Sequence, residues 1–598
     1  MKEDSLSDLA GSVLRGEAER SRELAEAALE AGTLPERILS DDLIPAMDVA
    51  GSRFESREFF LPDLLLSARA MHEALSLLTP LLAKREIQPV GRVVIGTVAG
   101  DLHDIGKNIV AAMLEGGGFA VHDLGYDVAP EVFAQAVREH SADIVALSAL
   151  LTTSRPVMQA VVSELEHVGL RDDVRVLVGG APLTATLAAE VGADAYAPTG
   201  SSAVTVARDL IEGSDEARLS ILNSAIVARP DHAASKSVTQ PNTSVASQSA
   251  AVQSEAVQRS SAAVTSRELV KQTLEFRKPA YLPRQLWLLP WAQQHHPEEV
   301  AEIERDFPPD IITIPMFCSE PVPGQGNAHS VGTFVDGWGC TFQNLQDGII
   351  GEVKEPLVTD WADTRHVRFP RKKLTIDKTQ VADFCRDTEQ YVLAGTCPRP
   401  FERLQFLRGT ENLYLDLGRP LQQLRDFIAR LHEFYVEELT LWAETNVDGI
   451  TFMDDWGSQH AVLISPDLWR ELFKPLYAEY IAIAHAHGKH AFMHSDGYIT
   501  DFIPDLIDIG LDALNSQVFC MDVEDLGKRF GGQITFWGEL DRQHLLPNAD
   551  PTEIESAAQR LKAAFHHDGG FIAQCEFGPG ARPENVHAFF AALAGEVD

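Results

Sequence analysis

The chain has 598 residues, of which 45% are apolar and 23% are charged, and both fractions are ordinary for a globular protein. Asp and Glu number 88 against 50 Lys and Arg, and the net charge of −38 argues against general binding to nucleic acid or to an anionic membrane, since both need a basic surface. No run of about 18 apolar residues predicts a spanning helix, and the N-terminal sequence carries no secretory signal, so we expect a cytoplasmic protein.

The first 88 residues are rich in strong helix formers and predict a helical cap over residues 1–88. Its expected helices cover residues 16–30, 43–54 and 61–78. From residue 89 to residue 214 the pattern changes, because short β-branched segments alternate with helical stretches. Apolar strands separated by helices are typical of a doubly wound parallel sheet with both faces covered. The expected strands are residues 92–98, 119–124, 144–147 and 174–178.

Residues 215–266 predict a flexible linker, because the Ser- and Ala-rich part from residue 231 onward holds no aromatic side chain and cannot bury enough apolar area to offset its chain entropy. Residues 267–598 again alternate between strand-like and helical segments. A domain of this length and pattern is typical of a (β/α)₈ TIM barrel. The expected strands are residues 311–315, 449–453, 490–494, 513–515 and 533–537, and the expected helices include 421–444 and 466–487. The sequence therefore predicts a multidomain α/β protein.

An aspartate, a histidine and a glycine follow the first expected strand, with the spacing Asp101-x-His103-x-x-Gly106. In doubly wound folds the loops at the carboxyl ends of the strands build the ligand crevice. One nitrogen of His103 can coordinate a metal while Asp101 holds the other N–H and fixes the tautomer, and Gly106 lets the backbone approach a bulky planar ligand. The alternative is an ordinary helix N-terminus, in which Asp101 caps the helix and His103 is merely solvated.

This spacing resembles the cobalamin-binding signature of methionine-synthase-like corrinoid proteins, and the resemblance spans residues 1 to about 214. It implies that His103 is the lower axial ligand of cobalt, that Asp101 is its partner, and that the helical cap covers the upper face of the corrin ring. Gly106 belongs to the same signature. The remaining cofactor contacts that the resemblance implies are made by Ser148, Thr152, Gly179 and Gly180.

Candidate ligands for a second metal stand at the ends of three expected barrel strands, and they are His494, Asp496, Glu539 and Cys575. Barrel chemistry comes from the carboxyl ends of the strands, so these side chains are expected to converge. A histidine, a cysteine and a carboxylate suit a catalytic zinc with an open position, where the metal acts as a Lewis acid. The alternative is a polar barrel mouth without a metal.

Two adjacent carboxylates, Asp454 and Asp455, follow the expected strand at residues 449–453. Paired carboxylates beside an aromatic side chain can hydrogen-bond or protonate a substrate, and with His494 they are the predicted catalytic residues. The alternative is that they form a cap that orders the loop.

The C-terminal domain resembles the uroporphyrinogen-decarboxylase-like superfamily, including its corrinoid-dependent methyltransferase branch, through segments that begin at Asp336, Asp454, Ser465, His494 and Pro583. Methyltransferases of this branch carry His-x-Cys and a later Cys as zinc ligands. His494 and Cys575 match this pattern, but Asp496 stands at the middle position, so the resemblance implies zinc with Asp496 or Glu539 as the third ligand. A tetrapyrrole decarboxylase needs cationic groups for its substrate's carboxylates, and Arg284 is the only obvious one.

The two halves together predict a corrinoid-dependent methyltransferase, because a covalent link keeps the cobalt carrier close to the barrel and proximity is a large part of methyl transfer. We expect the barrel to take a methyl group from a small donor, an O-methyl compound such as an aryl methyl ether, and to pass it to cobalt(I). Two alternatives stay open: transfer from methylcobalamin to a thiol or pterin acceptor, and a cobalamin sensor with a non-catalytic barrel. Besides the donor, the expected partners are a separate methyl-acceptor methyltransferase and a reductive activator.

Overall fold

The computed structural model describes residues 6–84, 88–150, 154–180, 183–213, 264–320, 322 and 324–596. Its N-terminal part is helical, as the sequence predicts. The side chain of Ser7 accepts a hydrogen bond from the amide of Ala10 and so caps the first helix. The helices are α1 (Asp8–Leu14), α2 (Ala18–Glu30), α3 (Pro35–Ile38), the π-helix η2 (Leu39–Leu43), α4 (Ile44–Glu55) and α5 (Leu61–Lys84).

A five-stranded parallel sheet follows, and it confirms the predicted doubly wound domain. Its strands are β1 (Arg92–Thr97), β2 (Ala120–Asp123), β3 (Ile144–Ser148), β4 (Arg175–Gly179) and β5 (Ala195–Tyr196), in the order β2-β1-β3-β4-β5. The helices between and after them are α6 (Ile105–Gly116), α7 (Pro130–His140), α8 (Arg155–His167), α9 (Ala185–Glu190) and α10 (Gly200–Glu212). The order reverses between β1 and β3, so ligands of this fold bind where the loops after these two strands part.

The C-terminal part is an eight-stranded parallel sheet in the order β6-β16-β15-β14-β13-β12-β11-β7. The amide of Asp310, just before β7, donates to the carbonyl of Arg284 in β6 at 2.8 Å, so the two edge strands meet and the sheet nearly closes into the predicted barrel. The strands are β6 (Arg284–Leu288), β7 (Ile311–Thr313), β11 (Tyr391–Leu393), β12 (Gly449–Met453), β13 (His490–Ser495), β14 (Ala513–Ser516), β15 (Thr535–Glu539) and β16 (Phe571–Phe577).

Helices surround this barrel, and in two places they differ from the prediction. The helix predicted at residues 466–487 is broken at Phe473, because Pro475 lacks an amide hydrogen and its ring excludes the preceding turn. Residues 215–263 of the predicted linker lie outside the described residues. The end of the predicted linker differs from the structure, because a helix already starts at Ser266. The helices are α12 (Ser266–Leu274), α13 (Pro290–His295), α14 (Pro297–Asp306), α15 (Lys378–Arg386), α16 (Pro400–Arg408), α17 (Thr410–Gly418), α18 (Gln422–Ala443), α19 (Pro466–Leu472), α20 (Lys474–Ala486), α21 (Ile503–Asp508), α22 (Val523–Phe530), α23 (Leu545–Asn548), α24 (Pro551–Phe565) and α25 (Pro583–Ala592).

A small antiparallel sheet interrupts the barrel after β7, and the sequence did not predict it. It consists of β8 (Gly332–Val335), β9 (Thr341–Asn344) and β10 (Glu352–Val353), in the order β10-β9-β8. β10 is an edge strand of two residues, so its free edge is open to contacts from outside the barrel.

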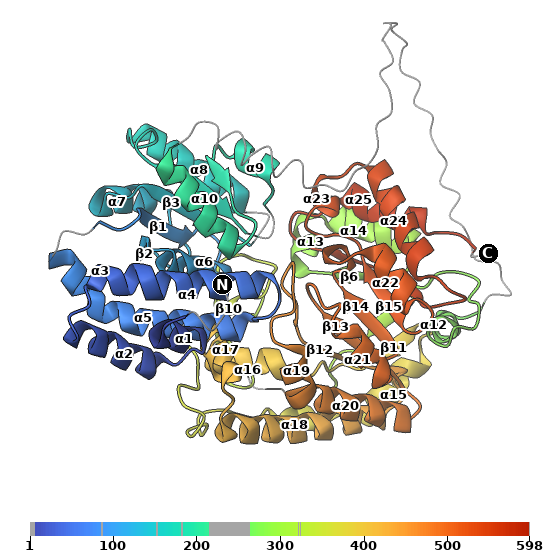
Figure 1. Cartoon of the computed structure of the whole chain (residues 1–598). Coiled ribbons are helices and arrows are strands. Elements are labelled where there is room, and N and C mark those ends of the chain that lie inside the picture. The colour runs from blue at the N-terminus through green and yellow to red at the C-terminus, as the bar shows by residue number, and fades with distance from the viewer. Residues whose placement is uncertain are drawn as a thin grey trace, which may run out of the picture.

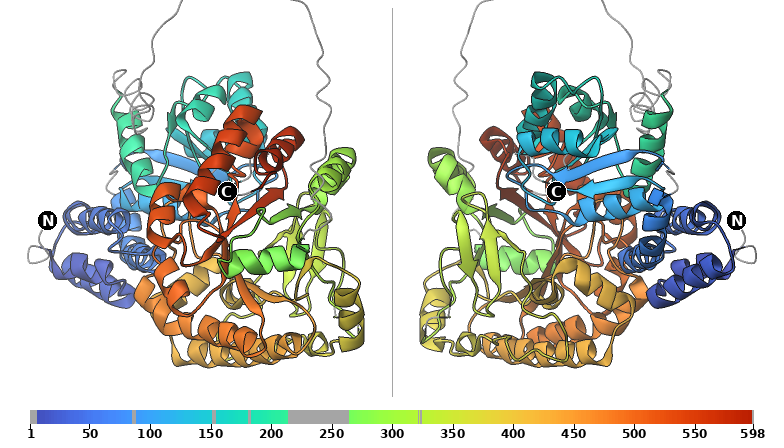
Figure 2. Two further views of the ribbon diagram at one scale, coloured as in Figure 1. Left: turned by 90° about the vertical axis from the view of Figure 1, so that its right-hand side faces the viewer. Right: turned by 90° about the vertical axis from the view of Figure 1, so that its left-hand side faces the viewer.

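The helical part lies beneath the five-stranded sheet and against one flank of the barrel (Figures 1 and 2). Leu61 and Leu65 of α5 belong to the same buried cluster as the outer core of the barrel. At the barrel rim, Arg57 donates to the Tyr498 hydroxyl at 2.8 Å and to the carbonyl of His460 at 2.9 Å. The helices of the described residues are all too short or too polar to cross a membrane.

Candidate functional site

The loop after β1 holds the predicted aspartate–histidine pair in a fixed arrangement. Asp101 is fully buried, and its Oδ1 accepts from the backbone amide of His103 at 3.0 Å and lies 2.7 Å from His103 Nδ1. Its other oxygen accepts from the amide of Leu150 at 2.7 Å and from Ser154 Oγ at 3.3 Å. The carboxylate is therefore locked by four donors and orients the imidazole, and it does not cap α6, which starts after Asp104 without a side-chain cap.

His103 turns its second nitrogen away from Asp101 and toward the barrel. Nε2 lies 3.1 Å from Oε1 of Glu352 in β10, and the side chain is 36% exposed. Burial acts to lower the pKa of His103, but the hydrogen bond to Asp101 and the charge of Glu352 outweigh it and raise that pKa. An imidazole whose Nδ1 is held by a carboxylate is the arrangement that prepares Nε2 for a metal.

The glycines around this loop leave room for a large ligand in some places and are required by the backbone in others. A Cβ on Gly106 would meet nothing within 4 Å, whereas a Cβ on Gly179 would lie 3.1 Å from the carbonyl oxygen of Ala197. Gly180 has φ +132°, and a Cβ there would lie 1.8 Å from the carbonyl oxygen of Ala149. Ser148 ends β3 as predicted, and Thr152 lies outside the described residues. The residues present thus fit a corrinoid with His103 beneath it.

At the barrel mouth, His494 is the last residue but one of β13, and its tautomer is set by an amide. Nδ1 lies 2.6 Å from Asn515 Oδ1. The amide nitrogen of Asn515 donates to the carbonyl of Trp537 at 2.6 Å and to Gln574 Oε1 at 3.1 Å, so its oxygen is the acceptor and His494 Nδ1 carries the proton. Nε2 is therefore directed at two carboxylates, with Asp496 Oδ1 at 3.4 Å and Asp455 Oδ1 at 3.7 Å.

Among the described residues, Asp455, His494 and Asp496 are the group whose ligand atoms all lie within 4.8 Å of one another. The Oδ1 atom of Asp496 is buried and has no hydrogen-bond partner. Burial and the charge of Asp496 raise the pKa of Asp455 to about 7. Burial also acts to raise the pKa of Asp496, but Arg542 and His494 lower it. One imidazole and two carboxylates are donors that suit a divalent metal.

Arg542 stands among three carboxylates next to this group, and the sequence prediction missed it. It pairs with Asp496, with Glu539 at 3.1 Å and with Glu576 at 3.0 Å. Glu539 is only 2% exposed, and burial raises its pKa to about 8. The position of Arg542, five residues past the predicted strand end at residue 537 and three past the end of β15, is the sequence signal that marks it, because barrel loops at that end line the mouth.

Cys575 does not join the mouth. It lies fully buried with Ala573 and Phe577 in the core that faces the helices, whereas its neighbour Gln574 points inward and accepts from Asn515. Burial raises the pKa of the Cys575 thiol well above its usual value, and a thiol that keeps its proton is a poor ligand. The structure thus brings together His494 and Asp496 but leaves out the predicted thiolate.

Asp454 is fully buried beneath the mouth and serves the start of α16. Its carboxylate accepts from the amides of Phe401 at 3.0 Å and Glu402 at 2.8 Å, and from the Tyr477 hydroxyl. Burial raises its pKa well above the usual value. These contacts match the alternative in which Asp454 is a cap, and they leave Asp455 as the carboxylate of the pair that faces His494.

A pocket of about 200 Å³ opens beside this group. Its lining includes Gln459, Gln517, Cys520, Glu539, Arg542 and His544. The Cys520 thiol donates to Gln459 Oε1 at 3.1 Å, and burial raises its pKa to about 12, so this thiol remains neutral. Trp287 lies against His494 with ring centroids 5.3 Å apart.

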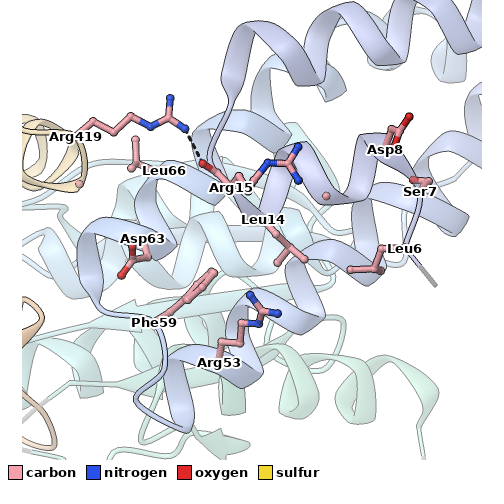
Figure 3. Close-up of a pocket in the computed structure, with 12 residues that line it drawn as sticks. Leu6, Ser7, Asp8, Leu14, Arg15, Arg53, Phe59, Asp63, Leu66 and Arg419 are labelled. Atoms are coloured by element: carbon pink, nitrogen blue, oxygen red, sulfur yellow. Dashed lines mark hydrogen bonds between the residues drawn. The ribbon is translucent and has the colours of Figure 1, made fainter. Parts of the chain in front are cut away.

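A larger pocket of about 540 Å³ lies elsewhere, between the start of α1, the turn before α5 and the end of α17. Figure 3 shows Arg419 of the barrel domain reaching the backbone of Arg15, to whose carbonyl it donates at 2.6 Å. Arg53 lies over the ring of Phe59 in the same pocket. It is part of the interface between the two halves and contains none of the predicted site residues.

Comparisons with known proteins match this architecture part by part. Models of the B12 binding domain match residues 6–79 and 91–207, and the model of uroporphyrinogen decarboxylase matches residues 333–595. Dimethylamine corrinoid protein 1 of Methanosarcina acetivorans is 40% identical over 212 residues, which are 35% of this chain and 99% of that protein. A corrinoid protein of Desulfitobacterium hafniense is 37% identical over 34% of this chain and 97% of its own length.

Among solved structures, the methanol:cobalamin methyltransferase complex of Methanosarcina barkeri is 28% identical, with a TM-score of 0.34, over 37% of this chain and 86% of that one. The corrinoid relatives are matched over nearly their whole length by residues of the first half. The chain therefore belongs to the corrinoid proteins, and its B12 binding domains are joined to a domain that matches the model of uroporphyrinogen decarboxylase.

Proposed function

We propose that the chain is a corrinoid-dependent methyltransferase in which the barrel takes a methyl group from a small O-methyl donor and delivers it to cobalt(I) above His103. The observation that carries the proposal is that one chain holds two histidines whose Nδ1 atoms are fixed by a neighbouring side chain and whose Nε2 atoms are left for another ligand. His103 has its Nδ1 held by Asp101 on the corrinoid side, and His494 faces two carboxylates at the mouth of a barrel.

Cobalamin, when bound, supplies a cobalt centre that accepts a methyl group. The chain's own contribution is to hold His103 in one tautomer through Asp101, so that Nε2 is presented as the axial ligand. Gly106 leaves space beside that ligand. The strand ends at Ser148 and Gly179, with Thr152 and Gly180 next to them, are proposed to flank the nucleotide tail.

Zinc is the proposed metal of the barrel mouth, where it supplies Lewis acidity to the donor oxygen. The distances favour Asp455 as the third ligand beside His494 and Asp496, ahead of Glu539 and Cys575. A site with one imidazole and two carboxylates is harder than a thiolate site, and it favours an oxygen leaving group over a sulfur one. Burial raises the pKa of Glu539 to about 8 although Arg542 acts to lower it, and Glu539 is therefore the proposed nearby acid.

The pocket supports a small donor, because its volume is about 200 Å³ and its lining combines two amides with Arg542. Aryl methyl ethers and related O-methyl compounds are the first donor class. Methylamines are the second, because the M. acetivorans relative is named for dimethylamine. Transfer to a thiol or pterin acceptor is the weaker alternative, since thiol activation ordinarily uses the thiolate-rich site that this mouth lacks.

The test uses the full chain loaded with cobalamin and reduced to cobalt(I). Its absorbance is recorded after addition of aryl methyl ethers, methanol or methylamines. We expect the methylcobalt spectrum with at least one O-methyl donor, and loss of that response in His494→Ala with the unreacted corrinoid spectrum retained. No response to any donor, together with no demethylation by thiols or pterins, contradicts the proposal and favours a cobalamin sensor.

A complete reaction also needs partners beyond this chain. The methyl group on cobalt must pass to an acceptor, and we propose a separate methyl-acceptor methyltransferase for that step. Cobalt(I) is readily lost by oxidation, so a reductive activator is the second proposed partner. Both partners are testable by whether their addition turns a single methylation into repeated turnover.

A further inference from the structure

The barrel reaches back to the corrinoid loop through one short segment, Glu352 to Lys354, at the free edge of β10. Glu352 Oε1 lies 3.1 Å from His103 Nε2. The ammonium of Lys354 donates to the carbonyl of Leu102 and lies 3.3 Å from Asp104 Oδ1. Three consecutive residues of the loop, Leu102 to Asp104, are therefore contacted by two side chains of the other domain.

The burial and the contacts of Lys354 distinguish this contact from an incidental one between two surfaces. Its side chain is only 9% exposed, although lysine is rarely buried unless it is paired. Besides the loop it pairs with Glu352 at 2.7 Å and lies 4.2 Å from the centre of the Tyr126 ring. The ammonium of Lys354 is held by two carboxylates, a carbonyl and an aromatic ring. Its side chain is therefore shielded from water and restricted to one conformation, unlike the side chains of an exposed surface ion pair.

The two side chains are also arranged to act together. Lys354 follows β10 directly, and its ion pair with Glu352 and the contacts of both side chains with the loop place them on the same side of the segment. A weaker contact lies nearby, where Asn108 of α6 donates to Glu411 at 3.5 Å. The segment thus forms a docking surface of the barrel whose partner is the corrinoid loop of the same chain.

The contact at Nε2 excludes cobalt. Asp101 holds His103 Nδ1, so Nε2 is the only nitrogen left for a further bond, and Glu352 lies directly in front of it. A hydrogen bond to Glu352 needs a proton on Nε2, whereas a bond to cobalt needs the lone pair of the same atom.

From this geometry we infer that docking of β10 on the corrinoid loop and coordination of cobalt by His103 compete for one nitrogen. The inference rests on the proposed role of His103 as the cobalt ligand. Glu352 and Lys354 then act as an internal brake on cobalamin binding, and bound cobalamin releases the loop from β10. Because such coupling is reciprocal, bound cobalamin weakens docking by the same factor by which docking weakens cobalamin binding.

The first test measures the Kd of hydroxocobalamin for the corrinoid-free full chain by absorbance titration. Glu352→Ala and Lys354→Ala are expected to bind at least about fivefold more tightly than the unmodified chain, the lower end of typical coupling energies. Glu355→Ala, at an exposed neighbour, and Lys372→Ala, at a distant exposed lysine paired with Glu320, are matched controls and should not change Kd. An unchanged or weaker affinity in both Glu352→Ala and Lys354→Ala overturns the inference.

The second test follows amide hydrogen exchange at residues 350–356 in the unmodified chain with and without hydroxocobalamin. Faster exchange on binding is expected, because β10 loses its contact with the loop, and unchanged or slower exchange overturns the inference. Neither test measures methyl transfer. The brake can therefore fail while the methyltransferase proposal stands, and an inactive barrel leaves both tests valid.

Discussion

His103 and His494 differ in the side chain that holds their Nδ1 atom. Nδ1 of His103 lies 2.7 Å from the carboxylate of Asp101, whereas Nδ1 of His494 lies 2.6 Å from the neutral amide of Asn515. A carboxylate places a negative charge behind the imidazole, whereas the amide of Asn515 is neutral. At His494 the negative charge comes instead from Asp455 and Asp496, on the side of Nε2. The first arrangement suits a tuned axial ligand and the second suits a site that itself binds the ion.

The largest expected effect is at His494. Its replacement by Ala removes the nitrogen that faces both carboxylates, so we expect metal content to fall to background and cobalt methylation to fall by more than about 100-fold, beyond the loss expected for a residue that only orients a ligand. Cys575→Ala is the matched control. Metal analysis and single-turnover absorbance check both, and a loss of metal in Cys575→Ala instead restores the thiolate site.

Asp101 tests the other side of the comparison. Asp101→Asn keeps the shape but removes the charge behind His103, and we expect cobalamin affinity to fall about 10- to 100-fold with a changed axial-ligand spectrum. Asn515→Ala should weaken metal binding at the mouth and leave the corrinoid spectrum as it is. Equal corrinoid spectra in Asp101→Asn and the unmodified chain speak against the assigned role of Asp101.

Substitutions at Gly180 and Gly106 distinguish a glycine that the backbone conformation requires from a glycine that leaves room for a ligand. Gly180→Ala places a Cβ 1.8 Å from the Ala149 carbonyl at φ +132°, so we expect a loss of at least about 2 kcal/mol in the free energy of unfolding of the corrinoid half. Gly106→Ala meets no neighbour and should leave stability unchanged while weakening cobalamin binding. Denaturant unfolding and cobalamin titration distinguish the two, and equal stability of both variants contradicts the expectation.

The smallest expected effect concerns Asp454. Asp454→Asn disturbs the hydrogen bonds to the start of α16 and should cost about 1 kcal/mol of stability, with metal content and methylation close to those of the unmodified chain. Asp455→Asn should lower metal content and methylation and leave the free energy of unfolding close to that of the unmodified chain. A loss of methylation in Asp454→Asn without a loss of stability makes Asp454 the acid that the sequence also allowed.

The corrinoid loop was predictable because its determinants are local. Asp101 and His103 are two residues apart, and a single turn brings the carboxylate to the ring. The fold classes of both halves followed from the alternation of strands and helices. Strands β5, β6 and β11 and the small sheet at residues 332–353 were not predicted, because short strands inside a polar or mixed context carry little periodicity.

The barrel mouth was predictable only in part, because its residues come from separate strands. Asp496 and Glu576 are far apart in the sequence, and closure of the barrel alone brings both to Arg542. Cys575 was misplaced for a specific reason. Barrel strands are buried on both faces, so β16 shows no alternation that tells whether Gln574 or Cys575 points inward.

The central claim is that the barrel methylates the cobalt carried by its own chain. The most direct measurement is the single-turnover rate of cobalt methylation by the reduced, cobalamin-loaded chain, recorded with saturating donor over a wide range of protein concentrations. We predict a first-order rate constant that does not depend on protein concentration, because the covalent connection makes the transfer intramolecular. A rate constant that rises in proportion to protein concentration, or no methylation at any concentration, contradicts the claim.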